Sequence, residues 1–255
     1  MLRRAVLALY ATASLVTAAS LTAAGNAGAS PATTIAAADP VIIVNGTGGP
    51  AFYYEALRSR LQDSGYQAWI FQLTNLGLGD IRNTTRDLAA FVASVRAQTG
   101  AAKVDLIGHS QGGLVARQYV KFEGGDRTVD SVIMFGSPNH GSLAANLARL
   151  FTFGTCIGIV ACEQMTVGSS FLATLNAGDD TYGPAEYTSF YTIYDEAAVP
   201  YTTAIMDDGA TNVKIQSQCP FRFVEHIAGI HDGTVFSGFL DALAHRPITL
   251  DCYAW

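Results

Sequence analysis

A serine stands in the segment Gly108-His109-Ser110-Gln111-Gly112, whose spacing fits G-x-S-x-G. This spacing is typical of a nucleophile elbow, a sharp turn between a strand and a helix that exposes a serine hydroxyl. Glycine is needed on both sides of the turn, because a Cβ would collide where the two backbones pass closely. A β-type run precedes the segment and a helical run follows it, so the segment predicts a serine nucleophile. The alternative is a structural Gly-Ser turn.

A serine hydroxyl needs a base to take its proton, and the base needs an acid that orients it. Five histidines are available, at positions 109, 140, 226, 231 and 245. His109 is next to the serine on the turn, so its ring should point away and take no part. The expected chain order is serine, acid, histidine, which excludes His140, and His245 lies at the end of the last predicted helix. His226 and His231 remain as candidate bases, both after the last predicted strand.

The acid should follow the penultimate strand, and Asp195 comes directly after the strand-like run at 188–194. Asp195 is therefore the predicted acid. Glu196 is the neighbouring carboxylate with which it could be confused. The segment Asp207-Asp208-Gly209 is more typical of a solvated turn.

A glycine-rich loop, Asn45-Gly46-Thr47-Gly48-Gly49-Pro50, follows the apolar run Val41–Val44. It lacks the Lys-Ser/Thr pair of a phosphate-binding loop and the spacing of a dinucleotide fingerprint. The other use of such a loop is to direct backbone N–H groups at an oxyanion. The candidate donors are the N–H and the hydroxyl of Thr47, and the alternative is an ordinary tight turn.

Strand-like runs alternate with helical patterns along the chain. Strands are predicted near 41–44, 67–73, 103–107, 131–135, 188–194 and 213–215. Helices are predicted at 53–63, from an N-cap within 83–85 to Gly100, from about 114, and at 235–244. This alternation predicts the α/β class, and with the elbow it predicts an α/β-hydrolase fold with a central, mostly parallel sheet and helices on both faces.

Residues 142–186 break this alternation with a long, apolar excursion. One interpretation is a cap or lid over an apolar pocket. The other is a helix packed on the core.

The N-terminus has the order of a secretory signal peptide: a basic Arg3-Arg4, an apolar run, and a small-residue Ala27-Gly28-Ala29. We therefore expect a signal peptide at 1–29, a loose mature N-terminus at 30–40 and a single domain at 41–255. The alternative, a membrane anchor, is weakened by the polar residues that interrupt the apolar run. The protein is thus expected to be extracellular, without a stable membrane anchor after cleavage.

In an oxidising compartment the four cysteines favour disulfides over metal ligands. The near neighbours Cys156 and Cys162 form one expected pair, and Cys219 and Cys252 form the other. The chain of 255 residues is 49% hydrophobic and carries a net charge of -6, which argues against a nucleic-acid partner. No cofactor or metal site is predicted, although a surface calcium site stays open.

Taken together, these segments resemble those of secreted bacterial class 2 triacylglycerol lipases and of the Candida antarctica lipase B type. Asn-Gly-Thr-Gly at 45–48 is similar to the oxyanion loop, with the threonine as a donor. Ser-Gln-Gly-Gly-Leu-Val at 110–115 is similar to the elbow, with Gln111 as the second donor. Tyr-Asp-Glu-Ala-Ala-Val-Pro at 194–200 resembles the acid loop. The segment from Cys219 to His226 resembles the one that carries the base.

The resemblance implies that His226 is the base, with His231 as runner-up, and that Cys219 pairs with a late cysteine, consistent with Cys252. Two departures stand out: bacterial members usually have His-Gly where this chain has Asn45-Gly46, and the longer C-terminal region of the fungal type is missing. Acyl-chain preference is therefore not carried over.

The expected function is a monomeric serine hydrolase that cleaves carboxylic esters of lipids through an acyl-enzyme, with its substrate at a lipid–water interface. Alternatives are a polyester hydrolase or an acyltransferase with the same Ser110, Asp195 and His226. A binding protein of this fold without catalysis is a further alternative, but it predicts a damaged triad, and all three residues are present.

Overall fold

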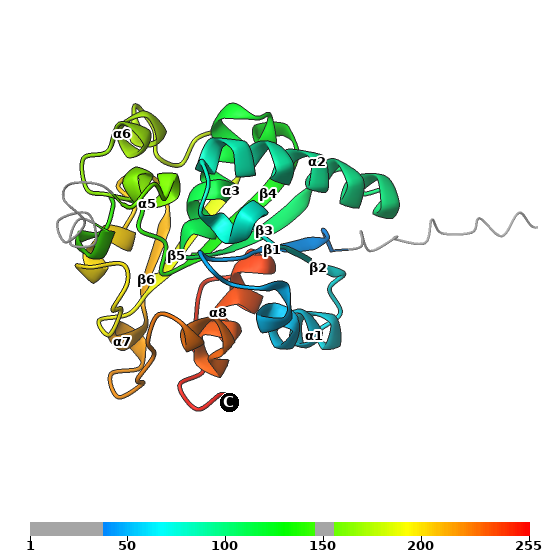
Figure 1. Ribbon diagram of the computed structural model, residues 1–255. Coiled ribbons are helices and arrows are strands. Elements are labelled where there is room, and N and C mark those ends of the chain that lie inside the picture. Colours follow the sequence, from blue (N-terminus) through cyan, green and yellow to red (C-terminus); the bar gives the residue numbers. More distant parts are fainter. Residues whose placement is uncertain (1–37, 146–155) are drawn as a thin grey trace, which may run out of the picture. The chain divides into compact units, whose positions relative to one another are not determined.

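The computed structural model describes residues 38–145 and 156–255, and these residues build one layered α/β unit (Figure 1). The predicted signal peptide at 1–29, most of the predicted segment 30–40, and residues 146–155 of the 142–186 excursion lie outside the described residues. No helix in the described ranges is long and apolar enough to cross a membrane.

The centre is a sheet of six strands in the order β2-β1-β3-β4-β5-β6, with every neighbouring pair parallel. The strands are β1 Val41–Val44, β2 Ala68–Phe71, β3 Val104–His109, β4 Val129–Phe135, β5 Glu186–Tyr191 and β6 Thr211–Lys214. All residues of β1 and β3 are buried, as expected for strands covered on both faces. The predicted mostly parallel α/β sheet is confirmed.

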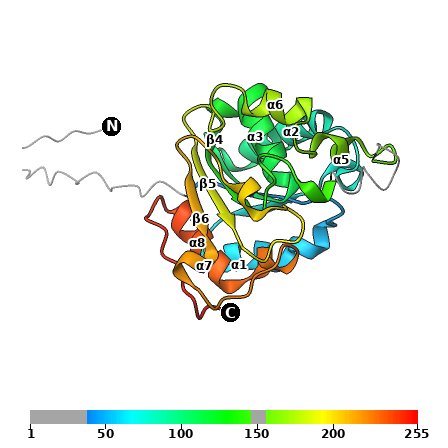
Figure 2. The ribbon, with the colours of Figure 1, turned by 90° about the vertical axis from the view of Figure 1, so that its left-hand side faces the viewer.

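Helices cover both faces of this sheet (Figures 1 and 2). The longer ones are α1 Glu55–Asp63, α2 Ile81–Thr99, α3 Gln111–Phe122 and α8 Gly233–Leu243, and the shorter ones are α5 Val160–Gln164, α6 Ser170–Asn176 and α7 Ile215–Gln218. Short 3-10 helices are η1 Ala51–Tyr54, η2 Thr74–Gly77, η3 Gly125–Arg127, η4 Tyr201–Ala204 and η5 Ala228–His231. One apolar core joins α2 and α3 to the sheet, and the other joins α1 and α8 to it.

The strand order reverses between β1 and β3. From β1 the chain crosses to β2 at one edge, and from β3 it continues through β4 toward the other edge. The loops that leave β1 and β3 therefore diverge, and such a reversal in a parallel sheet opens a crevice at the carboxyl ends of the strands. The glycine-rich loop at 45–50 and the elbow at Ser110 lie at this place.

Helix α2 begins at Ile81, earlier than the predicted N-cap within 83–85. Asp80 caps it, since its Oδ1 accepts from the backbone N of Arg82 at 2.8 Å. Gln164 of α5 then selects this start, because its side chain accepts from Ile81 N at 2.8 Å and donates to Asp80 Oδ1 at 2.6 Å. Helix α3 begins at Gln111, directly after the elbow serine, rather than near 114.

The described parts of the 142–186 excursion pack on the layer of α2 and α3. Phe171, Leu172 and Leu175 of α6 are buried in the same apolar core as α2 and α3. Lys121 at the end of α3 donates to the carbonyls of Leu175 at 2.8 Å and Ala177 at 2.7 Å. This part of the excursion therefore contributes to the core.

Both predicted disulfides are present. Cys156 and Cys162 close a short loop before and within α5, and Cys219 after α7 is bonded to Cys252 near the C-terminus. The second bond connects the end of the chain to the segment that leads to His226.

At the amino-terminal ends of the strands lies a group of carboxylates. Asp105 of β3 is 3% exposed, and its carboxyl lies near those of Asp39 and Asp130. Burial, followed by repulsion from these two carboxylates, raises the pKa of Asp105 to about 7. Lys103 offsets part of the negative charge through an ion pair with Asp130 at 2.6 Å. The group lies at the end of the sheet opposite to the crevice.

Candidate active site

Ser110 occupies the turn between β3 and α3 with φ 54° and ψ -124°, a conformation that residues other than glycine rarely adopt. The flanking glycines allow this turn. A Cβ on Gly108 would lie 2.6 Å from the backbone of Gly113, and a Cβ on Gly112 would overlap the backbone oxygen of Val44. The sequence motif thus forms the strand–turn–helix geometry of an elbow.

His226 and Asp195, predicted as base and acid, lie side by side. Nδ1 of His226 is 2.9 Å from Oδ1 and 3.0 Å from Oδ2 of Asp195. Both residues are buried, with 5% and 8% of their surface exposed. A carboxylate at Nδ1 fixes the tautomer that leaves the lone pair on Nε2, as a general base requires.

Neighbouring backbone groups fix this pair in place. Oδ1 of Asp195 accepts from the backbone N of Ala197 at 2.9 Å and of Ala198 at 2.7 Å. Glu196 has a different partner, since its Oε2 accepts from the backbone N of His226 at 3.0 Å. The neighbour that the sequence offers as a rival acid therefore supports the backbone of the histidine.

Gly136, the first residue after β4, touches the same pair. Its φ is +62°, and a Cβ at this position would lie 2.9 Å from His226 Nδ1 and 3.0 Å from Asp195 Oδ2. No side chain fits there without displacing His226 or Asp195.

The two predicted oxyanion donors come from loops that meet at the crevice. Thr47 lies in the loop after β1, and its hydroxyl donates to Oε1 of Gln111 at 2.7 Å. Gln111 is fully buried and is the first residue of α3, where backbone N–H groups have no partner within the helix. The Thr47–Gln111 bond thus connects the glycine-rich loop to the start of the elbow helix.

Two hollows meet at Ser110, and both are also lined by Thr47, His226 and Ile227. One, of about 250 Å³, runs along the glycine-rich loop to Tyr53. The other, of about 340 Å³, is walled by the 142–186 excursion, including Ser142, Cys162 and Met165. A molecule with two arms could therefore lie across Ser110 with one arm in each hollow.

Comparison with known proteins shows the family to which the chain belongs. A family model described as lipase (class 2) matches residues 38–235. The chain belongs to the class 2 lipase family. A triacylglycerol lipase of Burkholderia plantarii is 37% identical to this chain over 154 residues. The match covers 57% of this chain and 42% of the Burkholderia lipase. The chain thus spans less than half the length of this curated relative.

Two solved structures have a similar fold. Lipase B of Aspergillus fumigatus has a TM-score of 0.70 at 20% identity, over 83% of this chain and 54% of that chain. A mature lipase of Bacillus licheniformis has a TM-score of 0.65 at 19% identity, over 82% and 93% of the two chains. At these identities the similarity concerns the fold, and it confirms the predicted α/β-hydrolase fold.

His231, the second candidate base of this family member, lies elsewhere. Its ring packs against Tyr53 at 4.6 Å between centroids, and its backbone carbonyl accepts from Arg60 at 2.8 Å. Burial lowers the pKa of His231, and the nearby Arg60 lowers it further. It lines a hollow of about 420 Å³ that Ser110 does not line. The structure therefore brings His226, not His231, to Asp195.

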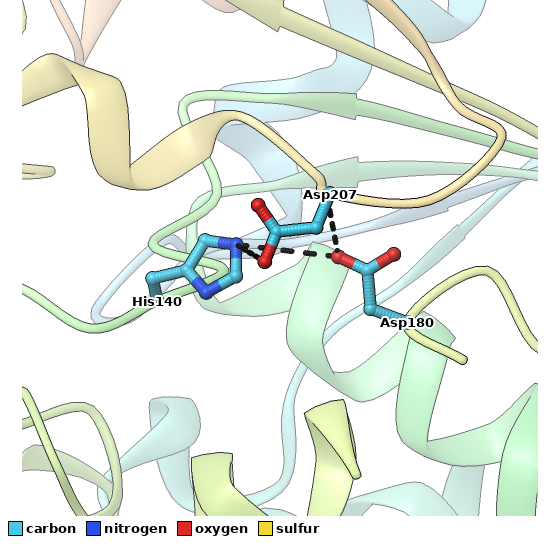
Figure 3. A group of neighbouring side chains, drawn as sticks. All are labelled: His140, Asp180 and Asp207. Atoms are coloured by element: carbon cyan, nitrogen blue, oxygen red, sulfur yellow. Dashed lines mark hydrogen bonds and ion pairs between the residues drawn. The ribbon is translucent and has the colours of Figure 1, made fainter. Parts of the chain in front are cut away.

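His140 faces two other carboxylates, those of Asp180 at 4.0 Å and Asp207 at 3.7 Å from its Nε2 (Figure 3). Arg117 donates to the side-chain oxygen of Asn176 at 2.8 Å, so the Asn176 amide nitrogen is the atom that faces His140 Nδ1, at 3.4 Å. His140, Asp180 and Asp207 present ligand atoms within 4.8 Å of one another, so this group could hold a metal ion.

Proposed function

We propose that this class 2 lipase family member is a secreted serine hydrolase that cleaves carboxylic esters of lipids. The observation that carries the proposal is the close pairing of His226 with Asp195 beside a hollow that Ser110 also lines. Membership of the class 2 lipase family supports the same chemistry. The relative from Burkholderia plantarii, of which the match covers 42%, is named a triacylglycerol lipase. Triacylglycerols are therefore the first substrates to test.

In the proposed reaction His226 Nε2 takes the proton of the Ser110 hydroxyl as the serine oxygen attacks the ester carbonyl. The carbonyl oxygen becomes an oxyanion, which the backbone N–H groups of Thr47 and Gln111 stabilise. Asp195 stabilises the charged ring through Nδ1. His226 then gives the proton to the departing alkoxide, and the alcohol leaves an acyl-enzyme on Ser110.

Water completes the cycle by the same steps in the same place. His226 takes a proton from the water, the resulting hydroxide attacks the acyl carbonyl, and the oxyanion again faces the two N–H groups. Collapse of this intermediate breaks the bond to the Ser110 oxygen, which regains its proton from His226. Loss of one oxyanion donor typically lowers the rate on the order of 100- to 1000-fold.

The two hollows fit the two halves of an ester. We propose that the hollow walled by Met165 and Cys162 takes the acyl chain, because its lining is mostly apolar and includes the flexible methionine side chain. The hollow that runs along the glycine-rich loop to Tyr53 then takes the alcohol.

Two disulfides and the signal-peptide pattern at 1–29 support secretion, because disulfides persist in oxidising compartments. The mature chain after about Ala29 would then be the active form. Detection of an N-terminus near residue 30 in culture medium tests this part of the proposal.

The function is tested by hydrolysis of nitrophenyl esters from acetate to palmitate and of a triacylglycerol emulsion, with Ser110→Ala as control. We expect the wild-type protein to cleave the series and the Ser110→Ala variant to show no turnover above background. Activity confined to the shortest esters would replace the lipase assignment with an esterase one. Absence of activity on every ester would refute the hydrolase.

A further inference from the structure

His109, which the sequence suggests takes no part, lies at the centre of a buried chain of hydrogen bonds. The backbone N of Gly46 donates to the Tyr54 hydroxyl at 2.8 Å. The Tyr54 hydroxyl is 2.8 Å from Nδ1 of His109, and Nε2 of His109 is 3.0 Å from the backbone carbonyl of His226. Tyr54, His109 and His226 are each at most 5% exposed.

The direction of every bond in this chain is fixed by its ends. The carbonyl of His226 can only accept, so Nε2 of His109 carries a hydrogen. Burial lowers the pKa of His109 to about 3, which leaves Nδ1 as an acceptor for the Tyr54 hydroxyl. Burial raises the pKa of Tyr54 to about 12, so this phenol keeps its proton. The order is Gly46 N–H, Tyr54 O–H, His109 N–H, His226 C=O.

This chain connects the three segments that the proposed reaction needs. It begins one residue before Thr47, passes through the residue before Ser110, and ends on the backbone of His226. Residues 222–225, which lead to His226, belong to no helix or strand. The backbone of His226 is thus positioned by side chains: Glu196 accepts from its N–H, and His109 donates to its carbonyl.

Two glycines of the loop after β1 pack closely against this chain. A Cβ on Gly49 would lie 2.8 Å from the Tyr54 hydroxyl, and a Cβ on Gly46 would lie 3.1 Å from Nδ1 of His109. The rings of His109 and His226 are themselves in contact, with centroids 5.2 Å apart. A change at Tyr54 or His109 is therefore transmitted to His226 rather than absorbed.

We propose that Tyr54 and His109 are positioning residues for the base His226, and that they set the placement of this base relative to the glycine-rich loop and the nucleophile. The inference rests on the proposed hydrolase function. Both residues also line the hollow along the glycine-rich loop, but their hydrogen-bonding atoms are engaged within this chain, so they act through the backbone of His226.

The test compares Tyr54→Phe with Tyr119→Phe in the full chain. Tyr119 is 4% exposed and its hydroxyl is 2.6 Å from that of Thr128, so the control removes one hydroxyl of a buried tyrosine away from the crevice. The assay measures kcat and KM on nitrophenyl butyrate, with the concentration of competent sites titrated by a phosphonate inhibitor. A melting curve of each variant shows that both are folded at the assay temperature.

We expect Tyr54→Phe to lower kcat per titrated site on the order of 10- to 100-fold, because small misplacements of a catalytic group have effects of this size. KM should stay within about twofold, and Tyr119→Phe should change neither constant by more than that. Equal kcat for Tyr54→Phe and wild type would overturn the proposal. So would a loss of titrated sites with unchanged kcat, since that is the result of a purely structural role.

Substitutions of His109 give an independent test, which decides if Tyr54→Phe does not fold. The amide of glutamine reaches the position of Nε2 and keeps a donor for His226, whereas the shorter asparagine reaches the position of Nδ1. We therefore expect His109→Gln to retain more kcat than His109→Asn. The reverse order would contradict the proposal. If wild type hydrolyses esters and these variants match it, the positioning role fails while the hydrolase function stands.

Discussion

Replacing Gly136 by alanine would place one methyl group against the His226–Asp195 pair. The new Cβ would lie 2.9 Å from His226 Nδ1 and 3.0 Å from Asp195 Oδ2, whereas ordinary van der Waals contacts begin at 3.4 Å. The ring and the carboxylate must therefore move apart or away from the methyl group by up to half an ångström. Their hydrogen bond, now 3.0 Å long, would lengthen or lose its alignment.

Two separate effects are expected from this substitution. The φ of +62° disfavours alanine, and this backbone strain costs about 1 kcal/mol of stability. The displaced acid–base pair lowers kcat on the order of 100-fold, the effect of a misplacement of about 1 Å or less. KM should change little, since Gly136 does not line either hollow at Ser110.

Gly100→Ala separates the two effects. Gly100 ends α2 with φ +73°, and a Cβ there would have no atom within 4 Å. This control should therefore lose the same stability in urea unfolding and keep the kcat of the wild type on nitrophenyl butyrate. If Gly136→Ala kept a kcat within twofold of Gly100→Ala, the assignment of His226 and Asp195 as the base and its orienting acid would be refuted.

Three further changes test other parts of the structure. The raised pKa of Asp105 means that the folded protein binds the Asp105 proton more tightly than the unfolded chain does. Protonated Asp105 therefore stabilises the fold by on the order of 4 kcal/mol at most. This stabilisation is present below about pH 4 and is lost as pH rises to about 7. Asp105→Asn should therefore gain melting temperature relative to wild type between pH 4 and pH 8, and a relative loss over that range would contradict the shift. Gly112→Ala should leave no folded protein by circular dichroism, because its Cβ overlaps the backbone of Val44; a normal spectrum would show that the elbow is wrong. His231→Gln should keep most of the kcat that His226→Gln loses, and the opposite ranking would move the base to His231.

The sheet could be predicted because each strand has a hydrophobic pattern that is visible in the local sequence. Val41–Val44 and the strand before Ser110 are continuous apolar runs, and a parallel sheet buries such runs on both faces. The steric role of Gly108 and Gly112 could also be predicted, since the elbow requires glycine at these positions. The proposed roles of Ser110, Asp195 and His226 rest on their order along this sheet and on the family resemblance.

The parts that could not be predicted depend on contacts between distant segments. Asp80 and Asn83 are both good N-caps, and the choice between them is made by Gln164 from a different part of the chain. The sequence favours Asp195 over Glu196 as the acid, but it gives no role to Glu196, whose carboxylate accepts from the backbone N of His226.

His109 shows the same limit. In the sequence His109 stands next to Ser110. Its hydrogen-bond partners in the structure, Tyr54 and the carbonyl of His226, are 55 and 117 positions away. The elbow motif predicts that the ring of His109 points away from Ser110, but it does not predict which groups the ring binds.

The most direct test of the central claim is the site at which the protein reacts with a fluorophosphonate. Mass spectrometry of the inactivated protein should find one phosphonyl group, attached to Ser110, with activity lost in proportion to labelling. The His226→Ala variant should react at a rate too slow to measure. A label on any other residue, or ester hydrolysis that continues in a protein fully labelled at Ser110, would contradict the account.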